Sequence, residues 1–371
     1  RLSGLDESVF QGNVNIQKNI FDLQSTIPQF KFSNIALNGI NIQSKGGRDS
    51  LQLEMDIEDV VFNDSLHSPD TKLNLVASND ISEIHITTSS NKTLNSADLS
   101  ANIQTMENGF DLKFHPSTFI INQKRWTIQG NSEFKLINDL ITVNQLKLSQ
   151  NGQEITVESH PSEFTNGNDI SIGIKNLIME DFTPLFFKYP KMQGLLSGNV
   201  LITDPFKKPT VAFNTSFDQF IFENDTVGTV KVSGNYLKNT GSLTASLVSE
   251  DEPYRIKGDI ATNLADSTSP LSGNIKLDNS GIHVLGSFLV GIVDDVRGRA
   301  TGNLTLSGTL NHPELTGKVS LDSTSMTVDY TQCRYTMKPN SIITFNPDEI
   351  DFGTITLYDI NKKTATLSGK I

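Results

Sequence analysis

Three clusters of carboxylates are the first residues whose types and spacing suggest chemistry. They are Glu54-x-Asp56-x-Glu58-Asp59, Glu250-Asp251-Glu252 and Asp348-Glu349-x-Asp351. Alternating carboxylates on one strand face can bind calcium, and a pair brought to the right separation can serve a glycosidase. None of the clusters matches an EF-hand loop or a calcium-binding nonapeptide repeat. We therefore expect solvated charges on strands and turns, and no metal site.

The histidines and the single cysteine form no recognisable catalytic or metal-binding pattern. The histidines are His67, His85, His115, His160, His283 and His312, and they stand too far apart for ligand spacing. Cys333 has no disulfide partner, and we expect it to be a small core residue rather than a nucleophile. The sequence also contains no Gly-x-Ser-x-Gly, P-loop or dinucleotide-binding motif. These observations predict a protein that is not an enzyme and needs no cofactor.

The composition further limits the class of protein to which this chain can belong. The 371 residues carry a formal net charge of −12, and 19% of them are charged. Because lysines and arginines are scattered along the sequence rather than clustered, we expect no nucleic-acid binding. No apolar run reaches the roughly 18 residues that span a bilayer. We expect the chain to be part of a longer protein whose membrane anchor lies outside this sequence.

Apolar and polar residues alternate along nearly the whole chain. Examples are Leu73-Asn74-Leu75, Leu304-Thr305-Leu306 and Val319-Ser320-Leu321. A period of two, rich in Thr, Val, Ile and Phe, predicts strands with one apolar face, and turns such as Asn151-Gly152 predict hairpins. We therefore predict an all-β fold, built as an elongated, repetitive folded sheet that is similar to a solenoid.

Two stretches repeat one pattern of glycines and a proline. Gly194-x3-Gly198-x10-Pro209 recurs as Gly298-x3-Gly302-x10-Pro313, each of the three residues returning after the same interval. Self-similarity at a fixed interval is typical of chains that stack one supersecondary unit. We expect the glycines to allow positive φ or close approach of neighbouring backbones. The landmarks predict an N-terminal strand-rich part at residues 1–170 and two repeats at 171–275 and 276–371, within one continuous sheet system.

A short apolar segment precedes each landmark and breaks the alternation. In residues 282–296, helical spacing relates Leu285, Leu289, Ile292 and Val296. Residues 181–192 are rich in Leu and Phe, and Pro190 is expected to end any helix there. We predict one or two short helical segments at these places.

The second landmark and its flanking residues resemble the translocation and assembly module family, TamB, and the wider AsmA-like group. The likeness rests on Gly298-x3-Gly302-Asn303-Leu304-Thr305-Leu306-x-Gly308-Thr309-Leu310-x2-Pro313-x-Leu315-x-Gly317, followed by a strand pair ending near Val328. Residues 350–371, and Trp126 in its hairpin with residues 144–157 after it, are similar to further parts of such proteins. The resemblance covers essentially the whole chain and is strongest from residue 110 onward.

The resemblance implies a fold, a location and partners. Such proteins resemble a long sheet folded lengthwise into a trough, a β-taco or β-groove with an apolar interior, which crosses the periplasm between inner and outer membranes. They are associated with outer-membrane protein assembly, beside a partner of the Omp85 type, and with phospholipid transfer between the two membranes. The family's inner-membrane anchor and its end near the outer membrane are expected to lie outside this sequence.

Apolar positions of the predicted strands are candidates for lining such a groove, which would shield acyl chains from water. They are Leu304, Leu306, Val319, Leu321, Met326 and Val328 in the second repeat, and Leu201, Phe213, Phe217 and Phe222 in the first. Alternation alone does not distinguish an open trough from an ordinary closed core, so both interpretations stay open.

Two other functions fit the same strand pattern. The first is an extracellular β-helical or sandwich protein that binds polysaccharide as an adhesin. It would need exposed aromatics beside a carboxylate-lined cleft, and the chain has one tryptophan, Trp126. The second is a structural spacer with a dry, closed core. Phospholipid that stays bound through purification favours the groove over both.

Overall fold

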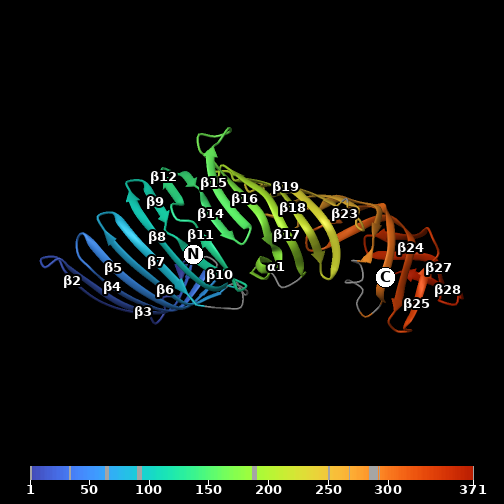
Figure 1. Ribbon diagram of the computed structural model, residues 1–371, viewed down its shortest axis with the longest axis horizontal. Helices are drawn as coiled ribbons and strands as arrows, with labels where there is room; N and C mark the ends of the chain where they lie inside the picture. Colours follow the sequence, from blue (N-terminus) through green and yellow to red (C-terminus); the bar gives the residue numbers. More distant parts are fainter. Residues whose placement is uncertain are drawn as a thin grey trace. The chain divides into compact units, whose positions relative to one another are not determined.

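The computed structural model shows two compact units, Arg1–Tyr189 and Pro190–Ile371, which we call unit 1 and unit 2 (Figure 1). It describes residues 2–32, 35–62, 67–89, 94–185, 190–249, 251–266, 268–283, 291 and 293–370. Nearly all regular structure is β-strand, which confirms the all-β prediction. Within the described residues, no helix has the length and apolar character needed to cross a membrane.

In the part of unit 1 that the structure describes, there are sixteen strands, one turn of α-helix and one 3-10 turn. Its elements are β1 (Leu2–Ser3), β2 (Val9–Asn15), β3 (Ile20–Phe32), β4 (Ile35–Gly46), β5 (Ser50–Val61), β6 (His67–Ser78), β7 (Ile81–Thr88), β8 (Leu94–Met106), β9 (Gly109–Phe114), β10 (Ser117–Ile121), β11 (Lys124–Ile128), β12 (Glu133–Ile137), β13 (Leu140–Asn144), β14 (Leu146–Gln150), β15 (Gln153–Pro161), β16 (Asn168–Ile178), α1 (Met179–Phe182) and η1 (Thr183–Leu185). Strands β2 to β8 follow one another as an antiparallel meander, visible in Figure 1 as neighbouring ribbons in chain order.

Beyond β8 the sheet of unit 1 splits into two branches. The C-terminal half of β8 pairs with β9, which leads on to β12 and β13, while its N-terminal half pairs with β10, which leads to β11 and β14. Buried serines satisfy backbone groups where the branches part. Ser100 N donates to the Ser117 hydroxyl at 2.9 Å, and the Ser132 hydroxyl donates to the carbonyl of Gln145 at 2.9 Å. A hydroxyl thus supplies the hydrogen bond that an interrupted ladder lacks.

The helical turn of unit 1 packs against the β10–β11 hairpin. Trp126 is fully buried there, stacked on Phe119 with ring centroids 6.0 Å apart and met edge-on by Phe182 at 5.4 Å. The helix predicted at residues 181–192 exists as α1 and η1, but it begins earlier and η1 ends at Leu185. Residues 186–189 lie outside the described residues, and β17 already starts at Met192.

The described residues of unit 2 form twelve strands. They are β17 (Met192–Thr203), β18 (Thr210–Phe222), β19 (Asp225–Leu237), β20 (Ser242–Ser249), β21 (Ile256–Asn263), β22 (Ser272–Gly281), β23 (Val293–Gly308), β24 (Pro313–Val328), β25 (Cys333–Met337), β26 (Ser341–Asn346), β27 (Glu349–Tyr358) and β28 (Thr364–Lys370). Strands β17 to β24 form an antiparallel meander. The long strand β24 then pairs with both β25 and β26, and β27 rejoins the two short strands and pairs with β28.

The two landmarks occupy equivalent places in two hairpins of unit 2. Gly198 of β17 lies opposite Thr215 of β18, and Gly302 of β23 lies opposite Val319 of β24. The partner residues Thr215 and Val319 are separated by the same interval as Gly198 and Gly302. The two hairpins therefore have the same strand register. Position 302 requires glycine for steric reasons, because a Cβ on Gly302 would lie 2.4 Å from the Lys318 carbonyl oxygen. The boundaries of the three segments named above stay a prediction.

The helix predicted at residues 282–296 is wrong at its C-terminal end. Val293 and Val296 belong to β23, and Val293 pairs with Val328 of β24. Residues 284–290 and 292, which include Leu285, Leu289 and Ile292, lie outside the described residues. Helical spacing over so few residues is weak evidence, and cross-strand pairing decides the structure from Val293 to Val296.

The largest apolar core of unit 2 lies between β22, β23, β24 and the C-terminal strands. Its buried members, the unit 2 core, are Ile282, Ala300, Leu304, Val319, Leu321, Met337, Ile355 and Leu357. Unit 1 has a smaller buried cluster of Ile27, Ile40, Ile57 and Val60.

Candidate functional site

An apolar cavity of about 390 Å³ opens beside the unit 2 core. Its walls are almost entirely hydrocarbon. The main lining residues are Val296, Leu321, Met326, Val328, Phe352 and Leu367. An apolar cavity of this kind favours hydrocarbon over charged ligands, because its few polar wall atoms compensate little for lost hydration.

Strand pairing positions these cavity residues. Val328 lies opposite Val293 at the end of the β23–β24 ladder, and Met326 lies opposite Tyr335 of β25. On the far side, Leu367 of β28 lies opposite Ile355 of β27, a member of the unit 2 core. Strands β25 and β26 both pair with β24, and β27 pairs with both of them and with β28. These strands therefore form a wall beside the last residues of β24.

One charged pair lies at this cavity. Lys370, which lines the cavity, places its Nζ 2.8 Å from Glu349 Oε1. The hydrogen bond to Glu349 is the main cause that raises the pKa of Lys370. The cation therefore stays protonated beside the hydrocarbon wall.

The candidate lining residues of the second repeat occupy two environments. Leu304 and Val319 belong to the buried unit 2 core, whereas Met326 and Val328 line the cavity. Leu321 belongs to both. Leu306 is half-buried and lies opposite Leu315 of β24 and Gly273 of β22.

The candidate lining residues of the first repeat are divided between faces. Phe217 and Phe222 pack against a cluster formed by Val227, Val230 and Tyr254. Phe213 is half-buried opposite Gly234. Leu201 is 40% exposed and alternates with Val200, the residue opposite Phe213, so it lies on the other face of the sheet. A groove-lining role for the ten candidates as a set stays a prediction.

Unit 1 has a partly uncovered apolar face. Leu53 lies opposite Leu75, which in turn lies opposite Ile84, and Met55, Leu73 and Ile86 form the next row. All six are half-buried, while the intervening residues Glu54, Asn74 and His85 are exposed. The alternation therefore produces an apolar sheet face that retains some contact with solvent.

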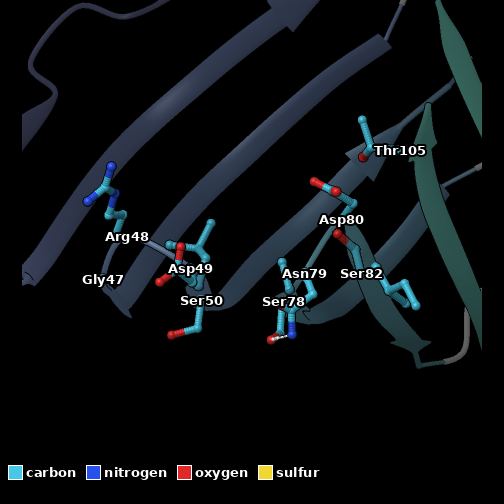
Figure 2. Close-up of a pocket in the computed structure, with 12 residues that line it drawn as sticks. Gly47, Arg48, Asp49, Ser50, Ser78, Asn79, Asp80, Ser82 and Thr105 are labelled. Atoms are coloured by element: carbon cyan, nitrogen blue, oxygen red, sulfur yellow. Dashed lines mark hydrogen bonds between the residues drawn. The ribbon is translucent and has the colours of Figure 1, made fainter. Parts of the chain in front are cut away.

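A polar hollow of about 450 Å³ lies along the turns of unit 1. Figure 2 shows residues of two hairpin turns along it, Arg48, Asp49 and Ser50 from one and Ser78, Asn79 and Asp80 from the other. The Asn79 amide donates to the Ser78 hydroxyl at 3.2 Å, and Thr105 N donates to the Asp80 carbonyl at 2.8 Å. These bonds stabilise the turns themselves.

The residues first considered for chemistry remain dispersed. Within the described part of the chain, no three His, Cys, Asp or Glu side chains come close enough to hold a metal ion. Three histidines pair with acids on the surface, among them His85 with Asp98 at 2.8 Å. Cys333 is exposed, so the expectation of a core cysteine is wrong. It begins β25 directly after a turn, where a strand residue need not face the core.

Several cavity residues were not among the candidates from sequence. Val296, Phe352 and Leu367 each lie in alternating segments, but no local pattern shows that β27 pairs with β25 and β26 and so brings β28 to the cavity. A search for apolar alternation in residues 350–371 would have named Phe352 and Leu367 as inward-facing, without naming their partners.

Comparison with known proteins agrees with the resemblance over a stretch that reaches from the first repeat into the second. Residues 236–321 match the family model described as TamB, N-terminal domain, and this stretch runs from the end of β19 into β24. No curated protein matches the chain, and no solved structure does. The match contains Leu304, Leu306, Val319 and Leu321. Together with the all-β fold, it supports the assignment of this chain to the TamB family.

Proposed function

We propose that this chain is a non-enzymatic segment of a TamB-like protein that shelters the acyl chains of phospholipids during transfer between inner and outer membranes. The observation that carries the proposal is the apolar cavity of about 390 Å³ beside the unit 2 core. An engineered apolar cavity of roughly 150 Å³ already binds benzene, so the space here suits a longer hydrocarbon. The partly uncovered apolar face of unit 1 offers a second sheltered surface.

The energetic requirement for such a carrier is modest. Each methylene moved out of water contributes about 0.8 kcal/mol, so a segment of about ten methylenes gains on the order of 8 kcal/mol before ordering costs. A bilayer offers a lipid chain a similar gain. The affinity of a carrier for an acyl chain therefore needs to match that of the bilayer only approximately. An apolar cavity that is partly open to solvent suits this requirement.

The proposed location and partners follow from the family. TamB proteins are generally periplasmic and associated with the cell envelope. In the full protein, an anchor in the inner membrane and an outer-membrane partner of the Omp85 type would place this segment between the two membranes. A role in outer-membrane protein assembly is the related possibility, because a nascent strand can extend a sheet edge by backbone pairing.

The test measures lipid bound to purified protein. The chain is purified without detergent, extracted with organic solvent and analysed by mass spectrometry. We expect phospholipid at a stoichiometric level in the wild type. Leu367→Trp, which fills the cavity, should reduce it severalfold. Leu201→Trp makes the same change at an exposed position on the opposite face of the sheet and should leave it unchanged.

Two results would contradict this function. A lipid-free extract from folded wild-type protein would remove the carrier role, and glycan binding on an array would then support the adhesin. Equal lipid content in the two tryptophan variants would show that any bound lipid lies outside the cavity. Since Trp126 is fully buried, an exposed tryptophan platform for sugars has no support from its position.

A further inference from the structure

Two turns of unit 2 carry the most exposed large apolar side chains among its described residues. Tyr330, in the turn between β24 and β25, is 97% exposed, and Ile360, in the turn between β27 and β28, is 81% exposed. Partly exposed apolar residues are common on protein surfaces, but these two side chains lie almost wholly outside the fold. Nearly all of their surface is therefore available for contact with something else.

Strand pairing places the two turns at the same end of β25. Val328 lies opposite Cys333 where β24 turns into β25, and Tyr358 lies opposite Thr336 where β27 ends. The three residues from Cys333 to Thr336 span about 10 Å at the usual strand rise. Because β27 runs antiparallel to β25, the chain after Tyr358 continues toward Cys333. Both exposed tips thus belong to one margin of unit 2.

The same margin adjoins the apolar cavity. Val328, the last residue of β24, lines the cavity and stands two residues before Tyr330. Its opposite residue in β23, Val293, lines the cavity as well. The cavity therefore extends to the end of the β23–β24 ladder, next to the first exposed tip.

Hydrogen bonds hold both turns in defined shapes. In the first turn, Gln332 N donates to the Val328 carbonyl at 2.8 Å. In the second turn, Asp359 Oδ1 accepts hydrogen bonds from the backbone N–H groups of Asn361 at 2.9 Å and Lys363 at 2.7 Å. A turn that is already ordered loses little conformational entropy when its tip binds another surface.

Lysines flank the second tip. Lys362 and Lys363 are exposed, and within the described residues neither side chain forms an ion pair. The acids of the two turns, Asp329 and Asp359, are half-buried, and Asp359 accepts the amide hydrogens of its own turn. The most accessible charge at this tip is therefore positive, although the whole chain carries a formal net charge of −12.

We propose that the two turns form a contact surface for a phospholipid bilayer with anionic headgroups. Tyrosine is enriched at the interface of membrane and water, where its ring meets hydrocarbon and its hydroxyl meets polar groups. Ile360 supplies further hydrocarbon, and the two lysines beside it attract anionic headgroups. Contact at this margin brings the end of the cavity to the bilayer surface. That consequence for loading rests on the proposed carrier function, whereas the contact itself does not.

The first test uses a nitrobenzoxadiazole label on Cys333, the single cysteine of the chain, which is exposed and directly follows the β24–β25 turn. Vesicles of phosphatidylglycerol and phosphatidylcholine should increase and blue-shift its fluorescence, because the label enters a less polar environment. Tyr330→Ser/Ile360→Ser should weaken vesicle binding severalfold. Leu264→Ser/Leu310→Ser is the control, since both leucines are exposed and Leu310 lies in the turn at the other end of β24; it should bind like the wild type.

Two further variants separate membrane contact from a defect in folding. Tyr330→Trp/Ile360→Trp should strengthen vesicle binding, because tryptophan is favoured at the membrane interface, and loss of folding cannot produce a gain. Lys362→Gln/Lys363→Gln should weaken binding to the vesicles that contain phosphatidylglycerol, most strongly at low salt. Binding to vesicles of phosphatidylcholine alone should be weak and the same in this variant as in the wild type.

Three outcomes would overturn the inference. The first is a wild-type label whose fluorescence does not respond to vesicles. The second is a Tyr330/Ile360 serine variant that binds vesicles as tightly as the Leu264/Leu310 control. The third is a wild-type dimer in sedimentation that dissociates in the serine variant, because the tips would then be a contact between copies of the chain. A lipid-free extract of the wild type, combined with vesicle binding that depends on the tips, would instead reject the carrier function and support the contact surface.

Discussion

Asp181 of α1 and Lys124 of β11 form a part-buried contact of 2.6 Å between residues far apart in the sequence of unit 1. Asp181 is 1% exposed, and its other oxygen accepts a hydrogen bond from the Asn122 amide at 2.6 Å. The pair anchors the helical turn over the β10–β11 hairpin, next to the packing of Phe182 on Trp126. A carboxylate so completely buried requires both donors.

The first prediction concerns this anchor. Asp181→Asn should lower the free energy of unfolding by about 2 kcal/mol, because hydrogen bonds to a charged group are lost and Lys124 keeps access to water. Urea unfolding measures the change. Asp56→Asn is the control, since its 3.6 Å pair with Lys72 is exposed and should contribute less than about 1 kcal/mol. Equal effects of the two substitutions would show that Asp181 does not anchor α1.

The second prediction concerns the landmark glycines. Gly302→Ala should destabilise unit 2 by about 1–3 kcal/mol, because the new Cβ meets the Lys318 carbonyl and the β23–β24 ladder must shift. Gly258→Ala in β21 is the matched control: its nearest neighbour atom would be 3.8 Å away. If thermal unfolding shows the same midpoint for both variants, the close approach at Gly302 has no energetic consequence.

Local patterns predicted the strands and the equivalence of the two hairpins, because strand alternation and the glycine requirement arise from neighbouring residues. They did not predict the contact of Asp181 with Lys124, since no local signal relates α1 to β11. For the same reason the helix predicted at residues 282–296 was wrong at its C-terminal end, where Val293 pairs with Val328 in a strand ladder. The cavity depends on the pairing of β27 with β25 and β26 and of β28 with β27, and alternation does not reveal these pairings.

The third prediction concerns acid stability in unit 1. Glu133 lies 3.0 Å from Lys135, and their hydrogen bond is the main cause that lowers the pKa of Glu133, with Lys113 adding to it. A lowered folded-state pKa means that the stabilisation is present above the unfolded value, about 4.3, and is lost as pH falls through the folded value. Glu133→Gln should therefore reduce stability at pH 7 and flatten its decline below about pH 4.5.

Chemical unfolding at a series of pH values checks this behaviour. Glu107→Gln, a change at an exposed residue of the β8–β9 turn, is the control and should leave the acid limb as in the wild type. An acid limb of unchanged slope in Glu133→Gln would rule out this carboxylate as a contributor.

The last prediction uses the cavity to separate loss of binding from loss of folding. Val319→Asp would bury an uncompensated carboxylate in the unit 2 core, where Val319 is 5% exposed, and should unfold unit 2. Such a variant gives no information about lipid binding.

Val328→Phe instead places extra hydrocarbon into the cavity, and filling an apolar void commonly increases the free energy of unfolding by about 0.5–2 kcal/mol. We expect a higher unfolding midpoint together with weaker retention of a fluorescent fatty acid. Loss of folding cannot explain this combination, because it would lower both the unfolding midpoint and the retention of the fatty acid. A higher midpoint with undiminished retention would instead place the acyl chain elsewhere, and the partly uncovered apolar face of unit 1 would be the next surface to test.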